Sequence, residues 1–162
     1  MEDRMMNDKL IGACGLYCGG CDNYLAFQEG QEHLLKTDKY LTPAIDKLKC
    51  NGCNSDSLSE HCSKCEIRKC AHNKGLEYCG ACNDFPCDIV MKFHQDGAVL
   101  DGARHRLDII KNTDHMRQGL KEWLDASERR WTCSCGLKFS YYEKQCHRCK
   151  ETLDSYATKE EI

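Results

Sequence analysis

The segment from Cys62 to Cys87 carries the same cysteine spacing twice, and this repeat constrains the fold more than any other feature of the sequence. Each copy reads Cys-x2-Cys-x4-Cys. A Cys-x2-Cys turn directs two sulfur atoms toward one point, and a second turn of this kind supplies the other two ligands of a tetrahedral metal ion. A hydrophobic core does not require thiols at this spacing. The repeat therefore predicts a chain that is organised around bound metal.

The number and grouping of the cysteines favour metal ligation over disulfide bonding. The chain has 15 cysteines among 162 residues, and five Cys-x2-Cys pairs account for ten of them. An odd total and such tight pairs argue against a disulfide framework. The first ten residues lack the apolar run of a secretory signal, so we expect a cytoplasmic protein whose thiols stay reduced. No apolar stretch approaches the roughly 18 residues of a membrane span, and we expect no membrane association.

Two thiol pairs near the C-terminus flank a loop that is rich in aromatic residues. Cys133 and Cys135 form the first pair, and Cys146 and Cys149 form the second. This arrangement predicts a zinc ribbon over residues 131–150. A segment of about 20 residues buries too little apolar area to fold alone, so metal would supply much of its stability.

The other eleven cysteines lie within residues 1–97, a region with few apolar side chains. The sequence leaves their pairing open. We favour Cys18/Cys21 with Cys50/Cys53, and Cys62/Cys65 with Cys79/Cys82, while His61 or His72 could complete a further site. With the C-terminal pairs, these thiols predict two or three zinc ions. The candidate ligands in this region are Cys14, Cys18, Cys21, Cys50, Cys53, Cys62, Cys65, Cys70, Cys79, Cys82 and Cys87.

Hydrophobic periodicity becomes helical after the last of these cysteines. The helix that starts at Pro86 is expected to end near His94, and the later helical segment is expected to break near Asn112-Thr113. The fold class expected is a small metal-organised α+β protein with four parts. These are an irregular α-rich multi-cysteine zinc domain (1–97), a helical segment (98–130), the zinc ribbon (131–150) and a disordered tail (151–162).

The ligand chemistry favours a binding role over catalysis. All-thiolate sites leave no open position for water, which is typical of structural zinc, so we expect a non-catalytic adaptor or binding module for a protein partner. An iron–sulfur protein or small redox enzyme component is the main alternative, because four thiolates serve a cluster equally well. Cys14-x3-Cys18-x2-Cys21 has the cluster spacing of radical S-adenosylmethionine enzymes, but Gly20 replaces their usual aromatic residue.

The residues alone suggest two further functions, nucleophilic catalysis and nucleic-acid binding. Cys14 or Cys70 with His33 or His72 could form a nucleophilic pair, but no local motif marks one, and clustered thiols are better explained as ligands. The ribbon could bind nucleic acid by stacking bases on its aromatic residues. The formal net charge of −3, which becomes more negative when thiols ionise, does not support phosphate binding. The aromatic candidates are Trp131, Phe139, Tyr141 and Tyr142.

The runs CGLYCGGC, CNGC, CEIRKC and CGACNDFPC resemble the bacterial and archaeal family known as domain of unknown function 3795. The GLKEWL run and the final thiol pairs resemble its longer members, so the resemblance covers roughly residues 11–150. It implies a small cysteine-rich, zinc-binding protein with no assigned activity. It extends the ligand role to every cysteine except Cys62, which is a candidate through the internal repeat.

Overall fold

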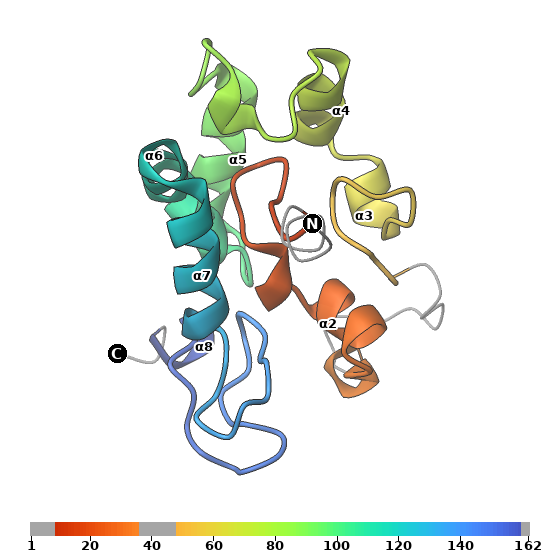
Figure 1. The fold of residues 1–162 in the computed structure, drawn as a ribbon, viewed down its shortest axis with the longest axis vertical. Coiled ribbons are helices and arrows are strands. Elements are labelled where there is room, and N and C mark those ends of the chain that lie inside the picture. Colours follow the sequence, from red (N-terminus) through yellow and green to blue (C-terminus); the bar gives the residue numbers. More distant parts are fainter. Residues whose placement is uncertain (1–8, 36–47, 160–162) are drawn as a thin grey trace.

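The structure is a computed structural model that describes residues 9–35 and 48–159. Short helices surround the N-terminal loop, which lies at the centre of the molecule in Figure 1. None of the described helices is both long and apolar enough to cross a membrane. In chain order the elements are η1 (Cys18–Gly20), α2 (Asp22–Gln28), η2 (Glu32–Leu35), α3 (Glu60–Ser63), α4 (Glu66–Asn73), η4 (Cys79–Ala81), α5 (Asp88–Val99), η5 (Arg104–Asp108), α6 (Ile109–Gln118), α7 (Leu120–Arg130) and α8 (Tyr156–Lys159).

The expected α+β fold class is wrong, because residues 9–35 and 48–159 contain no β-strand. The described backbone pairs only through isolated antiparallel bridges. At each bridge the chain reverses around a cysteine turn, and the paired segments are too short to form a named strand. The β structure of the zinc ribbon expected over 131–150 is therefore wrong as well, and two cysteine turns stand in its place. The bridges join Ile11 to Tyr17, Thr132 to Lys138 and Gln145 to Thr152.

Helices α5, α6 and α7 form one side of the molecule (Figure 1). Helix α5 passes through Gly97 to Val99, beyond the expected end near His94. Gly97 lies so close to η5 that an added Cβ would be 3.1 Å from the carbonyl oxygen of Ala103. The break expected near Asn112-Thr113 is also absent, because α6 runs to Gln118 and the chain turns at Gly119 instead.

Two clusters of buried apolar side chains hold these parts together. The larger joins the N-terminal loop, α7 and the C-terminal segment, where the ring of Trp131 lies 4.7 Å from that of Tyr141 and 5.5 Å from that of Phe139. The smaller lies between α4, α5 and α6 around Val90 and Ile109. Apolar packing therefore contributes to stability in both halves of the chain, alongside whatever bound metal supplies.

Residues 151–159 pack against the core, where the sequence predicts a disordered tail. Leu153 is buried, and Tyr156 on α8 lies against the ring of Trp131. The hydroxyl of Tyr156 also donates a hydrogen bond to the carboxylate of Asp108. The last three residues, 160–162, lie outside the described part of the chain.

Candidate metal centres

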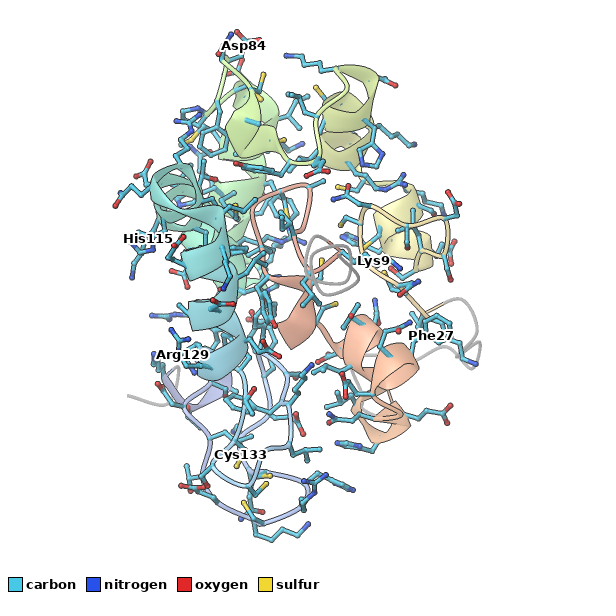
Figure 2. All side chains as sticks on the ribbon, in the orientation of Figure 1. Lys9, Phe27, Asp84, His115, Arg129 and Cys133 are labelled. Carbon is cyan, nitrogen blue, oxygen red and sulfur yellow. The ribbon has the colours of Figure 1, made fainter. Side chains whose placement is uncertain are left out.

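The C-terminal segment brings four thiols to one point. The sulfur atoms of Cys133, Cys135, Cys146 and Cys149 all lie within 4.8 Å of one another, and Figure 2 shows sulfur gathered around Cys133 in the blue segment. The Cys133–Cys149 and Cys135–Cys146 sulfur distances are 3.5 Å and 3.7 Å. Four sulfurs bound tetrahedrally at about 2.3 Å would lie about 3.8 Å apart. The quartet therefore fits one tetrahedral metal ion.

Backbone geometry presents these thiols. Gly136 follows Cys135 with φ +87°, and Lys150 follows Cys149 with φ +66°, so each turn ends in a left-handed residue. Burial raises the pKa of Cys146, but hydrogen bonds from the backbone N–H groups of Cys149 and Arg148 lower it to about 7 overall. Amide groups that stabilise a thiolate also stabilise a metal–thiolate bond.

The backbone of the hairpin from Ile11 to Tyr17 makes the same hydrogen bonds as the backbone of the hairpin from Thr132 to Lys138. Gly12 N–H donates to Leu16 O at 2.7 Å, and Cys133 N–H donates to Leu137 O at 2.8 Å. The next bonds, Gly15 N–H to Gly12 O and Gly136 N–H to Cys133 O, measure 2.9 and 2.8 Å. The glycines have φ +90° and +87°. Cys14 thus occupies the position that Cys135 has in the C-terminal quartet, and the shared Cys-Gly-Leu run is the sequence signal for this match.

Three of the Cys-x2-Cys pairs adopt the same tight turn. In each, the backbone N–H of the second cysteine donates to the carbonyl oxygen of the first, at 3.0 Å in Cys18–Cys21, 3.3 Å in Cys62–Cys65 and 2.9 Å in Cys79–Cys82. Such a turn points both side chains to one side of the chain. The structure therefore presents these six thiols in the paired form that metal binding needs.

The first N-terminal thiol group contains Cys18, Cys50, Cys53 and Cys62. A hydrogen bond with the Cys62 thiol, followed by burial, raises the pKa of Cys50. A hydrogen bond with Cys18 raises the pKa of Cys53, whereas a hydrogen bond with Cys62 lowers it. Cys18 therefore lies near Cys53, and Cys62 lies near Cys50 and Cys53. Among the described residues, however, only the C-terminal quartet brings three or more ligand atoms within 4.8 Å of one another, so the pairing favoured from the sequence stays a prediction.

Cys14 and Cys21 lie at the edge of this first group. Burial, then the neighbouring Cys53, raises the pKa of Cys14 well above its usual value. Burial, then Asp22, raises the pKa of Cys21 to about 12. A buried thiol with a raised pKa stays protonated until a metal displaces the proton, so metal binding here would release protons.

The second N-terminal thiol group contains Cys65, Cys70, Cys79, Cys82 and Cys87. Burial raises the pKa of Cys79 to about 12, with Cys87, Cys70, Cys82 and Cys65 as further contributors in that order. This group is open to solvent on one side, because the ammonium of Lys74 reaches the Cys82 sulfur at 3.2 Å from an exposed position. Burial and then Cys53 raise the pKa of Cys14 most, and Cys65 adds to this rise.

Neighbouring helices hold these turns in place. Arg117 on α6 donates to the carbonyl oxygen of Gly80 at 2.9 Å, inside the Cys79–Cys82 turn. Arg68 on α4 donates to the carbonyl oxygen of Cys53 at 2.7 Å. The backbone N–H of Cys79 donates to the carbonyl oxygen of Ala13 at 2.8 Å, which joins the two thiol groups. Sequence reasoning missed these supports, because the partners are distant in the chain.

The two histidine candidates differ in their surroundings. His72 Nε2 lies 2.9 Å from Asn54 Oδ1, in an exposed hydrogen bond. His61 lies next to Cys62, and burial followed by the positive charge of Arg106 lowers its pKa. Neither ring joins three or more ligand atoms within 4.8 Å in the described part of the chain. Either histidine would have to move its side chain to become a metal ligand.

The aromatic residues proposed for base stacking are used inside the molecule. Trp131, Phe139 and Tyr141 are buried in the larger apolar cluster. Tyr141 donates its backbone N–H to the carbonyl oxygen of Gly20 at 3.0 Å, and its hydroxyl donates to the carbonyl oxygen of Tyr17. These rings therefore attach the C-terminal segment to the N-terminal loop.

A family model covers the N-terminal part of the chain. Residues 10–92 match the family model described as a protein of unknown function, DUF3795, over half of the chain. The chain belongs to this family. In this DUF3795 protein the matched region contains all eleven N-terminal cysteines, whereas the C-terminal quartet lies beyond it, although the sequence resemblance was expected to reach about residue 150. No curated protein and no solved structure matches the chain.

Proposed function

We propose that this DUF3795 protein is a cytoplasmic zinc protein in which a zinc ion bound by Cys133, Cys135, Cys146 and Cys149 has a structural role. The convergence of four sulfur atoms within 4.8 Å carries this proposal. An all-thiolate tetrahedral set suits zinc and closes its coordination sphere, so no position is left for water or substrate. The ion would hold together two turns that share no β-sheet.

The N-terminal thiols would hold one or two further ions. The close contacts among Cys18, Cys50, Cys53 and Cys62 support one centre, and the grouping of Cys79 with Cys65, Cys70, Cys82 and Cys87 supports a second. Cys14 and Cys21 lie next to the first centre. No three of these thiols lie within 4.8 Å of one another in the described part of the chain, so they would have to move closer together to bind a metal ion.

The role that follows is that of a binding module with no chemistry at its metals. The burial of Trp131, Phe139 and Tyr141 favours a protein partner over nucleic acid, since these three rings are not available to bases. An iron–sulfur cluster in the first N-terminal group is the second candidate, supported by the four neighbouring thiols of that group. The two differ in colour, because a cluster absorbs visible light and zinc does not.

Metal analysis of anaerobically purified protein tests the proposal. We expect two or three equivalents of zinc and no visible absorption. The variant Cys146→Ser should lose about one equivalent, because three thiolates and a hydroxyl hold zinc less tightly. Ser134→Ala, in the same turn region but without a ligand, should keep the full content. Metal-free folded protein, or loss of metal equal in both variants, would refute the structural zinc site.

A further inference from the structure

A cavity of about 420 Å³ lies between the first N-terminal thiol group and the chain that joins α5 to α6. Cys14, Cys18 and Cys53 contribute to one side of its lining, and Phe93 and Arg106 contribute to another. Its volume is within the range of roughly 300–1,000 Å³ that is typical of small-molecule sites. An ion bound by thiolates at about 2.3 Å would fill a small part of it. The cavity therefore has room for a ligand beside the metal.

Arg106 is the one Lys or Arg side chain among the described residues that line this cavity. Its guanidinium lies over the ring of Phe93, with the central carbon 4.1 Å from the ring centroid. The Nε atom is buried and has no hydrogen-bond partner within residues 9–35 and 48–159. Its Nη1 forms a long ion pair with Asp96, at 3.9 Å, which leaves that donor without a short hydrogen bond. Stacking and this ion pair hold a planar cation at the cavity wall, where an oxyanion would compete with Asp96 for it.

A second cavity of about 480 Å³ adjoins the first. It lies between α4 and α5 and shares four lining residues with the thiol-lined cavity: His61, Cys65, Phe93 and Arg106. Arg106 therefore lies at the boundary between the two cavities, where a group bound to it borders the groove between the helices.

We propose that Arg106 binds the carboxylate or phosphate group of a small molecule whose flat apolar body occupies the thiol-lined cavity beside Phe93. An arginine fork pairs with either oxyanion through two parallel hydrogen bonds. The half-buried rings of Phe93 and Tyr142 supply apolar surface for the body of the ligand. This inference gives the binding module a ligand, and it rests on the proposed function in that the thiols are metal-loaded.

The test uses full-length, metal-loaded protein and three probes: benzoate, phenyl phosphate and the neutral benzamide. Affinities are measured by ligand-observed NMR titration. Benzoate or phenyl phosphate should bind at least about tenfold more tightly than benzamide, since hydrogen bonds to a charged group favour the anion. The tighter of the two anions identifies the oxyanion. Arg106→Gln should weaken its binding by about tenfold or more, whereas Arg104→Gln, exposed on the same 3-10 turn and outside both cavities, should leave it unchanged.

Metal content and thermal unfolding of each variant separate the possible failures. Arg106→Lys should bind with intermediate affinity, because lysine keeps the charge but lacks the planar fork. If metal-loaded wild-type protein binds benzamide with the same affinity as both anions, the inference is overturned, even if Arg106→Gln does not fold. Equal affinity of wild type and a folded Arg106→Gln would overturn it too. In both cases the zinc proposal stands, whereas purified protein without metal would refute the zinc proposal first.

Discussion

At the scale of single residues, glycines decide where thiols and rings can lie. Gly15 and Gly136 follow Cys14 and Cys135 with φ near +90°, a conformation that side chains rarely adopt, and both close the same kind of hairpin. Gly20 has a different purpose, because an added Cβ would lie 2.4 Å from Cε1 of Tyr141. The glycine-rich run before Cys21 thus makes room for the C-terminal segment.

Gly20→Ala should therefore destabilise the protein. The methyl group would force Tyr141 away from the N-terminal loop, and overpacking of this kind costs about 1–3 kcal/mol. Urea unfolding of the metal-loaded protein measures the change. Gln28→Ala, at the exposed end of α2, is the control and should change stability little. Equal stability of the two variants would show that Tyr141 does not pack on Gly20.

At the scale of elements, helix α6 supports thiol turns from distant parts of the chain. Asn112 donates to the carbonyl oxygen of Gly15 at 3.1 Å, and Arg117 donates to that of Gly80. Between them Thr113 is fully buried, close to both glycines. Its hydroxyl has no hydrogen-bond partner among the residues that the structure describes. The Thr113 hydroxyl thus fills space in the interior without the hydrogen bond that would offset its burial.

Replacement of this hydroxyl by a methyl group should stabilise the protein. Thr113→Val removes a buried unsatisfied polar atom and keeps the shape, for an expected gain of about 1 kcal/mol in the free energy of unfolding. The matched control is Thr132→Val, because the Thr132 hydroxyl donates to Glu128 O at 2.6 Å and its loss should be neutral or destabilising. Thermal or urea unfolding compares both. A loss of stability in Thr113→Val would mean that the hydroxyl is satisfied in solution.

At the scale of the whole molecule, thiol groups and apolar clusters alternate along the structure. The larger apolar cluster lies between the N-terminal loop and the C-terminal quartet, and the smaller lies beside the second thiol group. In the metal-free protein, burial raises the pKa of both Cys21 and Cys79 from 9.0 to about 12. Folding without metal therefore favours protonated thiols, whereas metal binding favours thiolates.

The metal-free and metal-loaded forms should respond to pH in opposite directions. A raised folded-state pKa gives full stability below the unfolded pKa, so the metal-free protein should lose stability as pH rises from about 9 toward 12. The metal-loaded protein should instead lose stability on acidification, because protons compete with metal for thiolates. Anaerobic urea unfolding from acidic pH up to about pH 12, with and without a chelator, gives both profiles. Parallel profiles would contradict the assignment of these thiols as ligands.

Sequence spacing was enough to find the C-terminal site but not the form of its backbone. Cys133, Cys135, Cys146 and Cys149 meet as their spacing predicts, yet the β-ribbon around them is wrong, because local spacing does not specify how far a hydrogen-bond ladder extends. The predicted end of helix α5 near His94 is wrong for a related reason. Glycine in a sequence usually indicates a break in a helix, but the missing side chain of Gly97 instead allows η5 to pack closely against α5.

The sequence by itself determined that thiols come in pairs, that two pairs converge near the C-terminus, and that the chain belongs to a cysteine-rich family, since these depend on short-range spacing. Only the tertiary structure decided which N-terminal thiols are neighbours and that Arg106 lines the same cavity as Cys14. Those relations join residues far apart in the chain, and packing of whole helices, rather than any local pattern, sets the distances between them.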